Sequence, residues 1–192
     1  MIIKFYSYIL IKSKSRFAIP FLSLISFLES IIFPIPTDIF IVPIVLSNKK
    51  KFLFIAFIAT FFSVLGGAVG YLIGQILWNE IGYELIKFYG LSEKAQKFEI
   101  IYEKYGIIAV IIGSITPFPY KVIALISGML SLPLGYFLIF SFIFRGLRFF
   151  IIALLIFHYG EKFDRMFKRY TLLFSLGFIF ILIMGFLLLK II

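Results

Sequence analysis

The sequence predicts an all-α polytopic membrane protein with two re-entrant, proline-tipped helical hairpins in an inverted repeat. About three spanning helices and an amphipathic N-terminal segment complete the predicted fold. Of the 192 residues, 62% are hydrophobic and 15% are charged, whereas soluble domains carry about 25% charged residues. The apolar residues gather in runs close to or above the roughly 20 residues that cross a bilayer. Two of these runs contain a Pro-x-Pro pair.

Neither of the first two segments is predicted to be a conventional spanning helix, and the reasons differ. Residues 1–16 are basic and mixed in polarity, which is typical of an amphipathic segment at the membrane surface. Residues 17–46 are apolar, but Pro34 and Pro36 interrupt them near the middle. Proline removes a backbone donor and clashes with the preceding turn, so a straight helix is excluded. We therefore expect a re-entrant hairpin over residues 17–46.

A conventional spanning helix is predicted over residues 52–78, which contain no charged side chain. Glycines at four-residue spacing share one face of this helix and favour close packing against another backbone; they are Gly66, Gly70 and Gly74. Residues 79–106 mix Glu and Lys with apolar residues. We expect them to form a polar connector of one or two short amphipathic helices.

The second half repeats this order. Residues 107–133 are apolar and contain Pro117 and Pro119, which predicts a second hairpin. Residues 134–159 predict a span, and residues 161–192 a charged turn with a C-terminal span. The segment Phe33–Asp38 and the segment Thr116–Lys121 share the pattern Pro-x-Pro-x-charge at an offset of 83 residues. Broken helices in corresponding positions of two halves indicate a transporter site near the bilayer midplane.

The distribution of basic residues predicts the orientation. If both hairpins are re-entrant, eleven Lys and Arg residues share the side of the N-terminus and five lie on the other side. Cytoplasmic loops carry the excess of Lys and Arg, so we expect a cytoplasmic N-terminus. Full crossing of both stretches gives a similar bias, so the proline residues, rather than this count, favour re-entrance.

Five ionisable side chains fall at predicted membrane depth: Glu29, Asp38, Lys121, Arg145 and Arg148. Such a residue at the centre of a spanning helix costs about 2.5–3.5 kcal/mol on insertion scales. We expect them to face a shared interior in which the two acids pair with two of the three bases, leaving one positive charge. Two arginines three residues apart share a helix face, and guanidinium groups bind phosphate bidentately.

Each of these charges has a structural and a functional interpretation. Arg145 and Arg148 either neutralise the acids, contact an anionic substrate or, for Arg148, reach the interface. Glu29 and Asp38 either form permanent salt bridges or carry protons in coupled transport. The sequence predicts no cofactor and no metal site, since it has no cysteine and one histidine. It likewise predicts neither an enzyme nor a nucleic-acid-binding protein.

Two segments resemble the DedA family, also described as the VTT-domain or SNARE-associated Golgi protein family, and in particular its YqaA-like branch. They are Phe27–Asp38 and Gly113–Gly128, and the resemblance covers residues 17–160. It implies two oppositely oriented re-entrant hairpins and movement of phospholipids or undecaprenyl phosphate between leaflets, in some members driven by the proton gradient. The family's acidic residues correspond to Glu29 and Asp38. Its arginines around the second proline segment are replaced here by Ser114 and Lys121.

We therefore expect a multi-pass transporter of the bacterial inner membrane that moves a phospholipid or lipid-linked phosphate between leaflets. Its partners would be membrane lipids, protons and further copies of the chain. In the expected site Asp38 lies near Lys121, with Glu29 and Arg145 in reach. The alternatives are a proton-coupled antiporter of a small ion or solute, and a non-transporting scaffold for membrane assembly.

Overall fold

The computed structural model describes residues 17–32, 36–88, 90, 92–116, 119–160 and 162, and every regular element among them is helical. The predicted amphipathic segment 1–16, most of the C-terminal segment 161–192, and the tip residues Pro34 and Pro117 lie outside the described residues.

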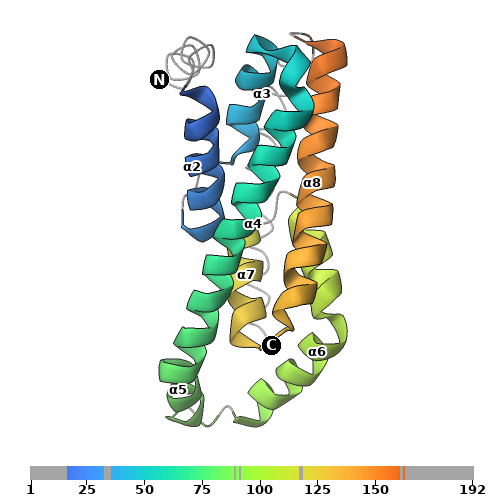
Figure 1. The fold of residues 1–192 in the computed structure, drawn as a ribbon. Helices are drawn as coiled ribbons and strands as arrows, with labels where there is room; N and C mark the ends of the chain where they lie inside the picture. The colour runs from blue at the N-terminus through green and yellow to red at the C-terminus, as the bar shows by residue number, and fades with distance from the viewer. Residues whose placement is uncertain are drawn as a thin grey trace.

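Two long helices run through the middle of the molecule (Figure 1). They are α4 (Phe52–Leu77) and α8 (Leu134–Tyr159), and each has 26 residues. At about 1.5 Å per residue each is roughly 39 Å long, enough to cross a hydrocarbon core of about 30 Å. Pro133 directly precedes α8, where a missing backbone donor costs no hydrogen bond. Both helices agree with the predicted spans 52–78 and 134–159.

The shorter helices form two antiparallel pairs at opposite ends of the long ones (Figure 1). The pairs are α2 (Ala18–Ile31) with α3 (Asp38–Ser47), and α6 (Ser92–Ile115) with α7 (Tyr120–Met129). The chain turns at the two Pro-x-Pro motifs, close to half the length of α4 and α8. The described prolines of the two motifs precede the second helices, Pro36 two residues before α3 and Pro119 directly before α7, where a missing backbone donor interrupts no helical ladder.

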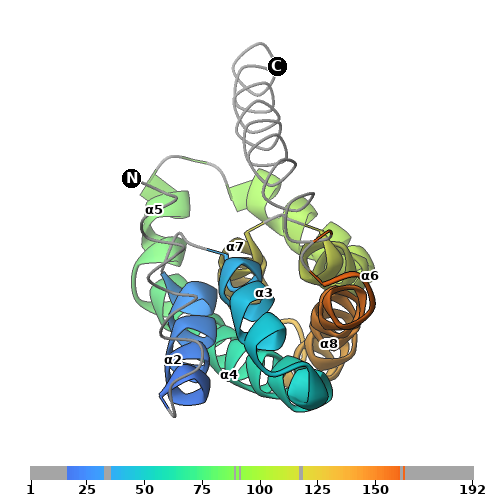
Figure 2. The same ribbon diagram turned by 90° about the horizontal axis from the view of Figure 1, so that it is seen from above.

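The two pairs contact the long helices in opposite order. In the first pair α2 packs on α4 and α3 on α8, whereas in the second pair α7 packs on α4 and α6 on α8. Viewed from above, α2 and α6 lie on opposite sides of the bundle with α3 and α7 between them (Figure 2). The second helices of the pairs, α3 and α7, have ten residues each, whereas the first helices differ, with 14 residues in α2 and 24 in α6.

The connector was predicted to be a separate segment that ends at residue 106, but in the structure it is continuous with the second helix pair. After α4 a π-helical turn, Trp78–Gly82, leads into α5 (Tyr83–Phe88), and α6 then runs unbroken from Ser92 to Ile115. The helix α5 and the start of α6 extend beyond the lower end of α8 (Figure 1). A glycine inside a helix costs only about 1 kcal/mol, so Gly106 does not end α6. The buried Tyr102, whose hydroxyl lies 2.8 Å from that of Ser127 on α7, ties this part of α6 into the bundle.

Both helix pairs come close to the backbone of α4 at its glycine-lined face. Gly66 faces the backbone of Phe27 on α2, and Gly74 faces the backbone of Leu125 on α7. Gly70, between them, faces both Ser30 of α2 and Ala124 of α7. Small residues at these positions let the backbones touch, as in helix packing within membranes.

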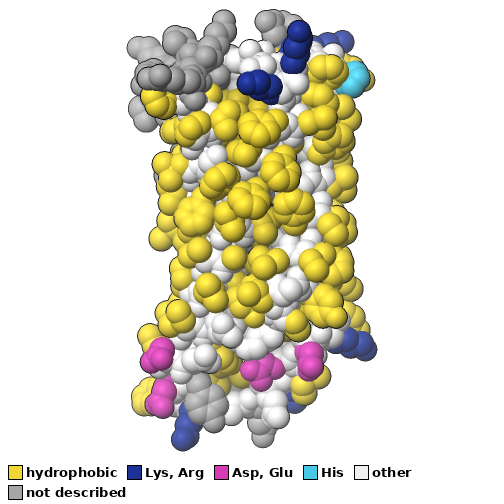
Figure 3. Space-filling model, in the orientation of Figure 1, with side chains coloured by type: hydrophobic (Ala, Val, Ile, Leu, Met, Phe, Trp, Pro, Cys, Tyr) yellow, Lys and Arg dark blue, Asp and Glu magenta, His cyan; other side chains and the backbone are white. Residues whose placement is uncertain are grey.

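The outer surface is apolar over its central part. In the described part of the chain two helical stretches are long and apolar enough to cross a membrane, Lys49–Phe88 and Leu134–Tyr159. Hydrophobic side chains cover a broad central band, and charged side chains gather at its two ends (Figure 3). Large exposed apolar patches on a protein mark surfaces that contact lipid or partners.

Candidate functional site

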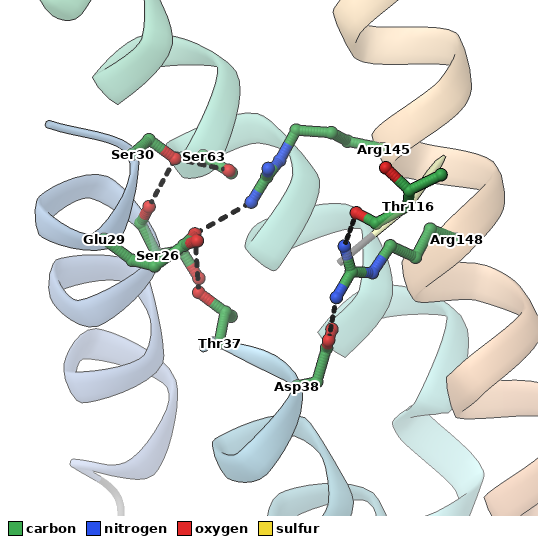
Figure 4. A network of polar contacts seen from close by, with 9 residues as sticks. All are labelled: Ser26, Glu29, Ser30, Thr37, Asp38, Ser63, Thr116, Arg145 and Arg148. Carbon is green, nitrogen blue, oxygen red and sulfur yellow. Dashed lines mark hydrogen bonds and ion pairs between the residues drawn. The ribbon is translucent and has the colours of Figure 1, made fainter. Parts of the chain in front are cut away.

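A polar cluster lies where the two helix breaks face the middle of α8. Arg145 stands eleven residues after the first residue of α8, and Arg148 eleven before the last. A separation of three residues puts both guanidinium groups on one face. Glu29, near the end of α2, and Asp38, at the start of α3, point toward them from the first pair (Figure 4).

Arg145 forms a buried salt bridge with Glu29. Its Nη2 atom donates to Oε2 of the carboxylate at 2.8 Å, and the exposed fractions of the two side chains are 3% and 18%. The hydroxyl of Thr37, in the turn before α3, donates to the same oxygen at 3.4 Å. Because removing charges from water is costly, such a pair persists only when its partners compensate each other.

Arg148 binds both helix pairs at once. Its Nη2 atom donates to Oδ2 of Asp38, and its Nη1 atom donates to the carbonyl oxygen of Thr116 at 2.7 Å. Asp38 is the first residue of α3, where the helix dipole favours a negative charge. Thr116 directly follows α6, where backbone carbonyls have no intrahelical partner. One guanidinium thus bridges the two helix breaks.

Lys121 contacts the backbone of the first helix pair. Its ammonium donates to the carbonyl oxygen of Ile32 at 3.2 Å, at the end of α2. The ion pair of Asp38 is instead formed with Arg148. Lys121 is the second residue of α7, whereas Arg148 lies on α8, which packs on α3, so packing rather than the sequence repeat selects the partner of Asp38. Lys121 still connects the second pair to the first.

The comparisons with known proteins bear on this region. A sequence model of the VTT domain matches residues 35–159. The chain belongs to the VTT-domain family of membrane proteins, also known as the DedA family. The matched range contains Asp38, Lys121 and both arginines of the cluster, and Glu29 lies just before it.

Relatives within the VTT-domain family cover most of the chain. An uncharacterized protein of Haemophilus influenzae is 36% identical over 79% of this chain and 78% of its own length. A homologous uncharacterized protein of Histophilus somni is 30% identical over 77% of both chains. An uncharacterized protein of Methanocaldococcus jannaschii is 32% identical over 65% of this chain and 75% of its own. No solved structure matches the chain significantly.

Hydroxyl groups surround the charges of this VTT-domain protein and, apart from Ser114, they were not singled out in the sequence. The hydroxyls of Ser30 on α2 and Ser63 on α4 lie 2.6 Å apart, and Ser30 also donates to the carbonyl of Ser26. Several buried polar atoms of the described residues have no protein hydrogen-bond partner: Ser26 Oγ, Asp38 Oδ1, Ser114 Oγ, Tyr120 Oη, Ser141 Oγ and Arg145 Nε. The sequence feature that could have indicated these residues is the occurrence of single serines inside apolar runs. Buried polar atoms of this kind are where ordered water binds.

The described part of this VTT-domain protein holds no group of three His, Cys, Asp or Glu side chains that could bind a metal ion. His158 is exposed near the end of α8 and contacts the carbonyl of Leu154, away from the cluster. Among the described residues, the site brings together two carboxylates, two guanidinium groups, one ammonium and their hydroxyl neighbours.

Proposed function

We propose that this protein moves a phospholipid or lipid-linked phosphate between the two leaflets of a membrane, with the cluster as its substrate site. The observation that carries the proposal is a pair of arginines at the centre of a membrane-length helix, each paired with a carboxylate from the broken first pair. Ionisable residues at such a depth are expensive and mark substrate pathways.

The fold supports a placement in which the helix pairs are re-entrant. If the apolar band of Figure 3 lies in the hydrocarbon core, α2 with α3 enters from one face and α6 with α7 from the other. Their broken tips then meet at the midplane beside Arg145 and Arg148. Non-helical backbone at this depth is tolerated only where it is buried in protein or lines a polar cavity. The proposed location is the bacterial inner membrane, with α2 and α3 on the cytoplasmic side.

A phosphate group fits the electrostatics of the cluster. Its three basic and two acidic side chains sum to a formal charge of +1, and guanidinium groups bind phosphate through two parallel hydrogen bonds. A phosphate that replaces a carboxylate on Arg148 keeps the buried cation paired, which avoids the large cost of an isolated buried charge. Protonation of the released carboxylate would then couple lipid movement to a pH gradient.

Loss of Arg148 tests the proposal. In vesicles that contain a headgroup-labelled phospholipid, Arg148→Gln should slow the exchange between leaflets by about ten- to a hundredfold, since hydrogen bonds to charged groups contribute about 1.5–3 kcal/mol. Asp38→Asn should also slow it. The measurement is quenching of the label by a membrane-impermeant reductant. Lys49→Gln, at an exposed lysine between α3 and α4, is the matched control and should retain the wild-type rate.

The outcomes separate the alternatives. Folded Arg148→Gln protein with undiminished lipid exchange contradicts the site. Transport of a small ion that needs a pH gradient, without any lipid exchange in the wild type, favours the antiporter instead.

Re-entrance makes a separate prediction that uses the absence of native cysteine. Single cysteines in place of Phe17 and Asn48 should react with an impermeant maleimide from one side of the membrane. Cysteines in place of Asn79 and Ser131 should react only from the other side. All four positions are exposed at the ends of the helices. Opposite labelling of Phe17 and Asn48, or of Asn79 and Ser131, shows that the stretch between them crosses fully.

A further inference from the structure

Tyr120 holds a position in the second helix pair that corresponds to Asp38 in the first. Asp38 begins α3 and Tyr120 begins α7, and both helices have ten residues. Asp38 contacts one arginine of α8, and Tyr120 contacts the other. The ring centroid of Tyr120 lies 4.2 Å from Cζ of Arg145, within the range of a cation–π interaction.

The Arg145 guanidinium is contacted by buried aromatic rings, of which Tyr120 is one. Tyr120 is 1% exposed, and its ring stacks on that of Phe137 with centroids 6.0 Å apart. The Phe149 ring, one turn further along α8, lies 5.1 Å from the same guanidinium carbon. Within the described part of the chain, Arg145 forms its ion pair through Nη2, and its Nε atom is buried without a hydrogen-bond partner. Aromatic faces therefore contact a guanidinium that has few polar contacts to the described residues.

A glycine of α4 provides the space that the ring occupies. A Cβ atom at Gly67 would lie 2.6 Å from Cε1 of Tyr120, closer than real Cβ contacts come. Gly67 lies beside the four-residue stripe of glycines and was not selected from the sequence. An alanine at this position would push the ring away from its present place beneath Arg145.

We propose that Tyr120 is a positioning residue, whose ring holds the Arg145 guanidinium against Glu29 and so ties the second helix pair to the salt bridge of the first. Only the transport part of this inference rests on the proposed function. A cation is attracted by the negative face of the ring, and the attraction is strongest where water is excluded. The ring rather than the hydroxyl carries this role.

Three variants and a control test the positioning role. Tyr120→Phe keeps the ring, pentafluorophenylalanine in place of Tyr120 reverses the charge of its face at similar shape, and Gly67→Ala displaces it. Gly135→Ala is the control, because nothing lies within 4 Å of a Cβ atom there. Circular dichroism and gel filtration in detergent establish that each protein is folded.

The first measurement is the nitrogen-15 spectrum of the arginine side chains, assigned with Arg145→Lys. A held guanidinium rotates slowly, so we expect separate Nη1 and Nη2 resonances of Arg145 in the wild type, Tyr120→Phe and Gly135→Ala. The resonances should merge in the pentafluorophenylalanine and Gly67→Ala proteins. Separate resonances in both of these proteins overturn the inference, as do merged resonances in Tyr120→Phe.

The second measurement is lipid exchange in vesicles. Tyr120→Phe should stay within about twofold of the wild type, and the other two variants should fall at least about tenfold, as expected for a desolvated cation–π contact. A wild type without lipid exchange contradicts the proposed function, and the nitrogen-15 spectra then still decide the role of Tyr120. Unchanged exchange in the pentafluorophenylalanine protein, where the wild type is active, overturns the inference.

Discussion

Arg145→Met is expected to lower the free energy of unfolding by about 3–5 kcal/mol, since it leaves the Glu29 carboxylate in the interior without its cation. Arg145 is 3% exposed and Glu29 18%, so water replaces the lost partner poorly. The measurement is reversible unfolding in mixed micelles at neutral pH. Lys49→Met, at an exposed position, is the control and should change the stability little.

A double variant shows whether the lost ion pair is the cause. Replacing both members of a buried salt bridge by well-packed hydrophobic residues of similar volume is often neutral for stability. Glu29→Met combined with Arg145→Met should therefore recover most of the loss. A double variant as unstable as Arg145→Met contradicts the explanation and points to the lost packing of the arginine side chain against Tyr120 and Phe149.

Gly74→Ala and Gly128→Ala are each expected to destabilise the protein by about 1–3 kcal/mol through overpacking. Helix propensity favours alanine over glycine by about 1 kcal/mol, so the sign depends on the contacts. A Cβ atom at Gly74 would meet the backbone of Leu125, and one at Gly128 the backbone of Tyr71. Two helix backbones cannot yield as a flexible side chain can. The measurement is again unfolding in mixed micelles.

Gly135→Ala is the matched control for the glycine variants, because its Cβ atom meets nothing within 4 Å. It should leave the stability unchanged or raise it slightly. A gain in stability for Gly74→Ala would contradict the close approach of α4 and α7. Loss in all three proteins would indicate a general effect of replacing glycine rather than a contact at these positions.

The two arginines of α8 each contact both helix pairs. Arg148 contacts Asp38 and the Thr116 carbonyl, and Arg145 contacts Glu29 and the Tyr120 ring. Each thus connects a group of the first helix pair to a group of the second. A ligand or proton that releases one carboxylate would alter the connection between the pairs as well as the charge of the site.

Local signals predicted most of the helices. The Pro-x-Pro pairs at 34 and 36 and at 117 and 119 predicted the helix breaks, because two closely spaced prolines remove two backbone donors from the same turn. The single Pro43, by contrast, lies within α3. The bounds of the predicted spans were set by the charged residues or the proline that flank each apolar run. The connector was less predictable, since Gly106 is a weak break that the contact between Tyr102 and Ser127 overrides.

The partners within the site could be predicted only in part. Charge balance in an apolar environment predicted that the acids pair with bases. The offset of 83 residues between the proline motifs aligned Asp38 with Lys121. The helices instead start at Asp38 and Tyr120, an offset of one residue fewer, and one residue turns a helix by about 100°. That rotation places an aromatic ring, rather than the lysine, against α8.

The sequence by itself therefore determined the membrane class, the two broken helix pairs and the five charges that must be compensated. These follow from composition and from residues that act within one helical turn. Only the tertiary structure decided which arginine meets which acid, that Gly67 makes room for Tyr120, and that serines surround the charges. Those features depend on the rotation of each helix about its axis and on contacts between residues far apart in the sequence, 116 positions in the case of Glu29 and Arg145.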